Sequence, residues 1–316
     1  MSLIARGRAL WRRQPALQAL AAGLALVHGL SGIVQLAIWS QQMRVLIHFL
    51  ETPPDAPPPP WPPQAMPTPQ MLALYGISWP LGLLALGLWA WLLRGLARAY
   101  AQPDRPVTWS DLFHRAWEPV VRLLAGLAAA FGLNLLVLYG VLMPLTGVVM
   151  LPLVVLTLVR PETLVLVFVL LLVLGIGWLV GIVLWFPWSL NLVLTPVLQT
   201  DTASPPELVS RWWRISRRGW RTFLSLALVW GGWVAGYTAL MLALMLAPLL
   251  PWLQQALTGR AAAAFSLPWW LWPLAFVVPA AATGLQAGLL SLWVVAYLDH
   301  HTQAATTVSP SPPTGG

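Results

Sequence analysis

The chain has 316 residues, of which 59% are hydrophobic and only 8% are charged. An ordinary soluble domain carries about 25% charged residues, so a soluble fold of this composition could not cover its own surface. The composition therefore excludes soluble enzyme folds and predicts an all-α membrane protein that crosses the bilayer several times. Because the chain has no cysteine, disulfides and thiolate chemistry are also excluded.

Six segments lack charged side chains and are long enough, at 1.5 Å per residue, to cross a hydrocarbon core of roughly 30 Å. They are residues 15–39, 71–93, 123–143, 163–187, 222–247 and 268–298. Residues 145–159 are also apolar, but this segment is short and is interrupted by Pro152. We therefore expect it to be re-entrant or to lie in the outer leaflet, which leaves a bundle of six transmembrane helices.

The arginines are distributed unevenly between the two sides of the predicted bundle. The chain has no lysine, and 14 of its 17 arginines precede the first span or lie in the loops after the second and fourth spans. Arg44, Arg160 and Arg260 lie in the other loops. Positive charge favours the cytoplasmic side, so both termini are predicted to be cytoplasmic in a bacterial-type inner membrane.

Two regions are expected to lie outside the bundle. Residues 53–69 contain ten prolines and predict an extended polyproline loop on the outer side. Residues 302–316 are small and polar, which is typical of a disordered tail. The predicted membrane domain is therefore residues 1–301.

An internal repeat is the most specific pattern in the chain. Thr108, Asp111 and Arg115 recur as Ser204, Glu207 and Arg211, and each copy has the form [ST]-x-x-[DE]-L-x-x-R-x-W. The spacing predicts a helix N-cap with a capping box, followed by an ion pair between residues four apart. Cytoplasmic amphipathic helices are expected near residues 2–14, 108–118 and 204–218. Each would precede one of three transmembrane hairpins.

The second copy resembles a known family. Its residues Ser204, Pro205, Glu207, Trp213 and Ile215 are similar to a pattern before the fifth span of the glycerophosphoryl diester phosphodiesterase membrane domain and related six-helix membrane proteins. The ending Val294-Val-Ala-Tyr-Leu-Asp299 also looks like the last span of that family. The resemblance implies a six-span fold and no defined activity.

The sequence offers little for catalysis. The catalytic part of that phosphodiesterase family would need a His-Arg-Gly tripeptide, and the nearest match is His114-Arg115-Ala116. The nine acidic residues are scattered over loops, so neither paired carboxylates nor a metal site is visible. We therefore expect a protein that is not an enzyme and has no cofactor. The absence of ionisable acids within spans also argues against ion-driven transport.

A few uncharged polar residues fall within the predicted spans, among them His28, Gln35, Asn134 and Gln286. Hydrogen bonding between helices is the expected role for such residues. An alternative for His28 is axial ligation of a haem or chlorin. Small residues four apart, such as Ala25 and Gly29, predict close helix contacts. Similar faces occur at Gly177 and Gly181 in the fourth span, Gly232 and Gly236 in the fifth, and Ala280, Gly284 and Gly288 in the sixth.

The leading hypothesis is a structural or accessory membrane protein that organises lipid or a partner protein at the cytoplasmic face. Membrane lipids are the expected partners, together with another membrane protein or a second copy of the chain, and nucleic acid is not. The residues predicted to bind anionic headgroups are Arg211, Trp212, Trp213, Arg214, Arg217, Arg218 and Arg221. Two alternatives remain: a permease or channel subunit for a lipidic or small apolar solute, and a pigment- or haem-bearing subunit of a larger complex.

Overall fold

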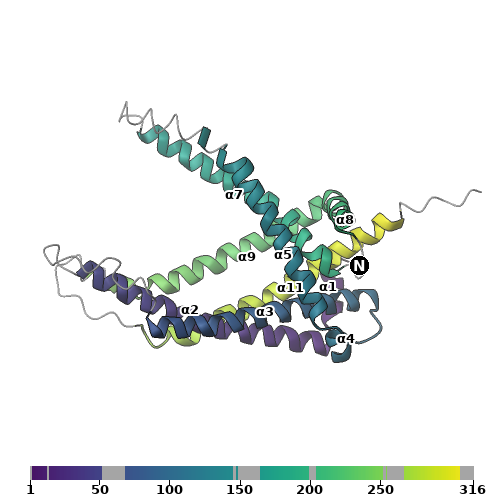
Figure 1. Cartoon of the computed structure of the whole chain (residues 1–316), viewed down its shortest axis with the longest axis horizontal. Helices are drawn as coiled ribbons and strands as arrows, with labels where there is room; N and C mark the ends of the chain where they lie inside the picture. Colours follow the sequence, from purple (N-terminus) through teal and green to yellow (C-terminus); the bar gives the residue numbers. More distant parts are fainter. Residues whose placement is uncertain are drawn as a thin grey trace, which may run out of the picture. The chain divides into compact units, whose positions relative to one another are not determined.

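The computed structural model describes residues 2–12, 14–51, 68–144, 147–148, 164–198, 204–251, 254 and 267–306. Within these ranges every regular element is helical (Figure 1), which confirms the predicted all-α class. The helices are α1 (Leu3–Arg12), α2 (Pro15–Glu51), α3 (Pro69–Ala101), α4 (Trp109–Phe113), α5 (Trp117–Val137) with the π-helical turn η1 (Leu138–Leu142), α7 (Leu164–Leu198), α8 (Pro205–Arg218), α9 (Trp220–Leu246) and α11 (Leu271–Thr306).

Five of the helical segments are long and apolar enough to cross a membrane, which makes this a multi-pass membrane protein. They are Pro15–Arg44, Pro69–Ala101, Trp117–Gly140, Trp220–Leu246 and Leu271–Thr302. The predicted fourth span corresponds to helix α7. Within α7, Leu184–Leu198 is a shorter apolar helical segment.

Several predicted features change or fall outside the described residues. The proline-rich loop lies outside them except at its end, where the Thr68 hydroxyl accepts a hydrogen bond of 3.2 Å from the Met71 amide and caps α3. The segment 145–159 also lies outside them, apart from residues 147–148. The tail prediction is wrong at its start, because α11 continues through Thr302 to Thr306.

The chain divides into two compact units. The first comprises Met1–Leu10, Leu93–Gly231 and Ser291–Gly316, and the second comprises Trp11–Leu92 and Gly232–Leu290. In the second unit α2 contacts α11 closely, as the small residues of the first predicted span indicate. A Cβ atom on Gly29 would lie 2.7 Å from the Phe276 ring, and one on Gly32 would collide with the Ala275 carbonyl oxygen.

Not every predicted small-residue face makes such a contact. A Cβ atom built on any of the glycines of the fourth, fifth and sixth spans named above would meet nothing within 4 Å among the described residues. Close approach is therefore confirmed for the first span. At those other glycines the described residues leave room for a side chain.

In the first unit α7 packs against both α5 and α8. The backbones of α5 and α7 approach each other closely at Gly126 of α5, where a Cβ atom would lie 2.5 Å from the Val193 carbonyl oxygen and 3.0 Å from its Cα. Both are backbone atoms, so the contact cannot be relieved by a side-chain rotation. Gly126 therefore sets the distance between α5 and α7.

We predict that Gly126→Ala lowers the free energy of unfolding by about 1–3 kcal/mol through overpacking. Gly132→Ala on the same helix is the matched control, because nothing lies within 4 Å of its added Cβ. Alanine also has a higher helix propensity than glycine, so the control is expected to be neutral or slightly stabilising. The measurement is the unfolding midpoint in detergent. Equal midpoints for the two variants would contradict this account of the packing.

Candidate functional site: the amphipathic helix α8

Helix α8 begins with two prolines and ends before a glycine. Pro205 and Pro206 carry no amide hydrogen, so the first two positions have no donor for a capping side chain, and Ser204 forms no side-chain cap. At the other end, a Cβ atom on Gly219 would lie 2.5 Å from the Phe223 ring and 2.7 Å from the His300 ring. A larger residue there would require the Phe223 and His300 rings to shift.

One face of α8 is buried within the protein. Trp212 and Ile215 are 7% and 1% exposed, and Trp212 packs in a cluster with Ala130 and Leu192. The indole of Trp212 donates a hydrogen bond of 2.7 Å to the Trp188 carbonyl oxygen. The expectation that Trp212 meets lipid therefore changes, because the contacts of this side chain are with α5 and α7.

The same face carries a buried polar network. The Asn191 side chain of α7 donates to the Ser216 hydroxyl of α8 at 3.1 Å and accepts from the Trp293 indole of α11 at 2.8 Å. One turn further along α7, the Thr195 hydroxyl lies 2.8 Å from the Tyr297 hydroxyl. All five side chains are at most 2% exposed. The network fixes α8 and α11 against α7.

Sequence reasoning missed this network. The predicted fourth span ends at residue 187, so the prediction leaves Asn191 and Thr195 in the loop that follows it. Helix α7 continues to Leu198. The available signal was a single asparagine in the apolar run Leu190–Leu194, because a polar side chain in such a run needs a partner.

The rest of the α8 surface, continued by the first turn of α9, is exposed and combines arginine with tryptophan. Trp213 and Trp220 are 50% and 49% exposed. The Trp213 ring lies against Trp188, with 4.8 Å between ring centroids, and the Arg221 guanidinium lies 5.8 Å from the Trp220 ring. Four arginines of the same stretch are exposed: Arg214, Arg217 and Arg218 of α8 and Arg221 of α9.

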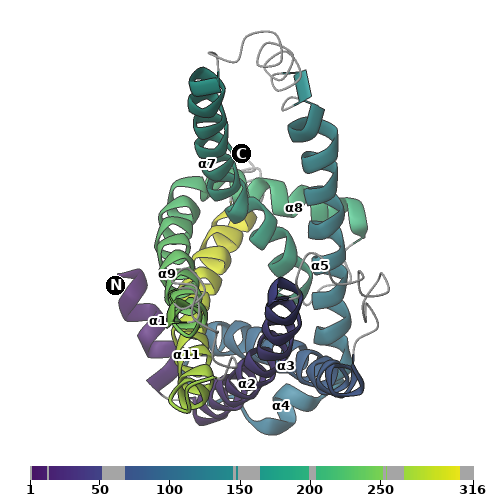
Figure 2. The ribbon, with the colours of Figure 1, turned by 90° about the vertical axis from the view of Figure 1, so that its left-hand side faces the viewer.

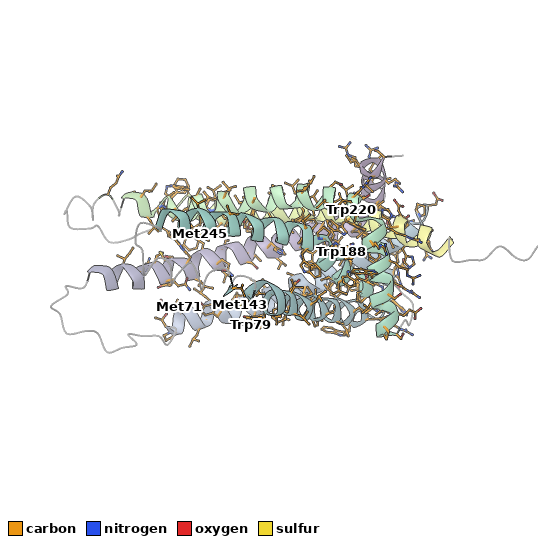
Figure 3. The ribbon with its side chains drawn as sticks, turned by 90° about the horizontal axis from the view of Figure 1, so that it is seen from above. Met71, Trp79, Met143, Trp188, Trp220 and Met245 are labelled. Atoms are coloured by element: carbon orange, nitrogen blue, oxygen red, sulfur yellow. The ribbon has the colours of Figure 1, made fainter. Side chains whose placement is uncertain are left out.

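Helix α8 runs crosswise to α5 and α7 (Figure 2). Figure 3 shows Trp188 and Trp220 at the end of the unit where α8 lies. If α5 and α7 cross the membrane, this orientation places α8 along the membrane surface. Amphipathic helices with basic and aromatic residues adopt this position at the boundary between headgroups and acyl chains.

The two repeat copies each form a different half of the predicted motif. In the second copy, Arg211 pairs with Glu207 at 2.8 Å as predicted. In the first copy the capping box forms, because the Asp111 amide donates to the Thr108 hydroxyl and the Thr108 amide donates to the Asp111 carboxylate. Hydrogen bonds from the Thr108 hydroxyl and amide lower the pKa of the Asp111 carboxyl.

The rest of the first copy differs from the prediction. Helix α4 ends at Phe113, and Arg115 adopts a left-handed backbone with φ of 51°, so the predicted helix over 108–118 is broken. Asp111 pairs with Arg98 at 3.4 Å and with Arg105 at 3.9 Å instead of with Arg115. The reason is tertiary, because the end of α3 brings Arg98 to the carboxylate.

The polar residues of the spans have different environments. Asn134 joins α5 to α7, since its side chain donates to the Ser189 hydroxyl at 3.2 Å and accepts from the Trp185 indole at 2.6 Å. The expected interhelical role of Asn134 is therefore confirmed. His28 Nδ1 lies 3.0 Å from the Leu24 carbonyl oxygen, and its ring faces the edge of Trp89. Gln35 is exposed and Gln286 is half-buried.

Within the part of the chain that the structure describes, no three His, Asp or Glu side chains gather in a way that could hold a metal ion. No family model, curated protein or solved structure matches the chain. The resemblance to the glycerophosphoryl diester phosphodiesterase membrane domain therefore stays a prediction.

The adjacent tryptophans of α8 allow the core and the surface to be tested separately. We predict that Trp212→Ala lowers the free energy of unfolding by about 3–5 kcal/mol, because it empties a buried site. Trp213→Ala is expected to lower the free energy of unfolding by only about 0.5–1.5 kcal/mol, since half of that side chain is exposed and the loss is chiefly the contact with the Trp188 ring. Unfolding midpoints in detergent distinguish the two variants. Equal losses would contradict the assignment of these two faces.

Proposed function

We propose that this chain is a non-enzymatic membrane protein that gathers anionic phospholipid at the cytoplasmic face through α8. The observation that carries the proposal is the exposed surface of α8 and of the first turn of α9, which holds four arginines and two half-exposed tryptophans. Helix α8 itself crosses α5 and α7 (Figure 2). Each arginine near an anionic surface contributes roughly 1 kcal/mol of attraction, which salt weakens.

The proposed architecture has six spans as three hairpins, with both termini in the cytoplasm. Five apolar helices and the length of α7 support six crossings, and the arginine distribution supports the orientation. In this arrangement α8 lies at the inner membrane surface. Trp213, Arg214, Arg217 and Arg221 then have the lipid-facing role, while Arg211 is held by Glu207.

The topology is tested with single cysteines, for which the chain has no native background. We expect Ala56→Cys and Gly259→Cys to react with an impermeant maleimide in intact cells. Ser110→Cys and Ser210→Cys should react only after lysis. Labelling of Ser210→Cys in intact cells would overturn the six-span arrangement.

The lipid preference is tested with the full chain in phosphatidylcholine vesicles that contain spin-labelled lipids. We expect phosphatidylglycerol to be enriched next to the protein and the enrichment to fall with added salt. Arg214→Gln plus Arg217→Gln should weaken it by about 2 kcal/mol at the sites that α8 contacts.

The matched control is Arg44→Gln plus Arg260→Gln, which removes the same charge from the predicted outer side. This control should leave the enrichment at α8 unchanged. Equal enrichment of phosphatidylcholine and phosphatidylglycerol next to the wild-type protein would contradict the proposed function. The arginines of α8 would then serve only to orient the chain during insertion.

A further inference from the structure

A second group of arginines surrounds a pocket in the first unit, away from the exposed face of α8. The pocket has a volume of about 240 Å³ and lies between the end of α3, the turn before α5 and the end of α7. Its charged and titratable lining residues are Arg94, Arg98, His114, Arg115, Glu118 and Arg122. The sequence patterns assign these arginines to orientation and, for Arg115, to an ion pair with Asp111, but predict no pocket.

The pocket lies where the apolar segments end. Arg94 directly follows the apolar segment 71–93, and Arg122 directly precedes the segment 123–143. Pro119 and Val197 add an apolar part to the lining. In a membrane-embedded chain, side chains at such a boundary lie at the depth of lipid headgroups.

Positive charge in the pocket exceeds the negative charge available to neutralise it. Arg122 pairs with Glu118 at 2.7 Å, and Arg98 pairs with Asp111 at 3.4 Å. Arg94 donates instead to the Arg115 carbonyl oxygen at 3.4 Å, and among the described residues no carboxylate lies within 4 Å of it. Its charged neighbours are Arg98, Arg115, Arg122 and the single acid Glu118. Four arginines therefore line the pocket, against Glu118 in the lining and Asp111 beside Arg98, and an additional anion would relieve the repulsion among the guanidinium groups.

The backbone adds to this positive potential. Arg115 is held in the left-handed region, and its carbonyl oxygen accepts from the Glu118 amide at 3.0 Å. Helix α5 then begins at Trp117 after Ala116, which has no side-chain oxygen to cap it. Glu118 and Pro119 of this first turn line the pocket, so the N-terminal end of a 21-residue helix, which carries a partial positive charge, borders it.

We propose that this pocket binds the phosphate group of an anionic phospholipid, with Arg94 and Arg122 as its main contacts. Guanidinium groups bind phosphate oxygens through paired, charge-assisted hydrogen bonds. Free phosphate shares this chemistry, but the position beside two apolar segments and the apolar lining favour a lipid. The inference rests on the proposed membrane orientation. It concerns one retained lipid, in contrast to the lipid layer gathered by α8.

The test is native mass spectrometry of the full chain released from nanodiscs of phosphatidylcholine with a minor fraction of phosphatidylglycerol. Wild-type protein should retain one phosphatidylglycerol. Arg94→Gln should weaken its retention about tenfold, because a charge-assisted contact is lost. Arg8→Gln, which removes an exposed arginine of α1 that belongs neither to the pocket nor to α8, is the matched control and should retain the lipid as wild type does.

A second variant covers the case in which Arg94→Gln fails to fold. Glu118→Gln removes the carboxylate that competes for Arg122, so it should strengthen retention of phosphatidylglycerol. A folded Arg94→Gln protein that retains the lipid as wild type does, or a Glu118→Gln protein with unchanged retention, would overturn the proposal.

The source of the phosphate is tested with millimolar inorganic phosphate added to the lipid-depleted protein in detergent. We expect it to leave the unfolding midpoint unchanged, whereas phosphatidylglycerol raises it. Equal stabilisation by inorganic phosphate would overturn the assignment to a lipid. The two proposals can fail separately. The variant Arg214→Gln plus Arg217→Gln tests the lipid enrichment by α8, and the pocket should retain its single lipid in this variant.

Discussion

The structure of the first unit depends on a buried asparagine in an apolar helix. Asn191 has an amide end and a carbonyl end, and each has a partner on a different helix. Leaving either end unpaired would cost about 1–3 kcal/mol, so the arrangement that satisfies both is strongly selected. Apolar packing alone tolerates sliding and rotation of helices. The directional bonds of Asn191 fix which faces of α8 and α11 meet α7, and thereby which face of α8 remains exposed.

A second polar group, the half-buried Asp299 carboxylate, also joins several helices of the first unit. The Asp299 carboxylate of α11 accepts from Arg6 of α1 at 2.8 Å and from the Tyr100 hydroxyl of α3 at 2.6 Å. One acid therefore ties together the ends of three helices in the first unit. In a chain with few charges, each carboxylate has several arginines available. The geometry decides which of them it binds.

The arginines illustrate this competition. Arg211 pairs with Glu207, the carboxylate one turn before it. Asp111, in contrast, pairs with Arg98 and Arg105 and not with Arg115. An ion pair between residues four apart on an exposed helix contributes only about 0.3–0.5 kcal/mol, so a tertiary neighbour readily displaces it. Arg115 therefore lies in the turn before α5 without the ion pair that the repeat predicts. There it joins Arg94 and Arg122 around a pocket that no local pattern indicates.

Composition and local patterns along the chain are enough to predict the membrane class, the approximate positions of the long helices and the features that depend on neighbouring residues. The Thr108 capping box and the Glu207–Arg211 pair are of this kind, because their partners lie within one helical turn. The tertiary structure decided which face of α8 is buried, and so why Trp212 and Trp213 differ. It also decided that Asn191 pairs with residues 25 and 102 positions away, and that Arg94 and Arg122 meet. These contacts join residues far apart in the chain, and the periodicity of a single helix carries no information about which neighbour it will meet.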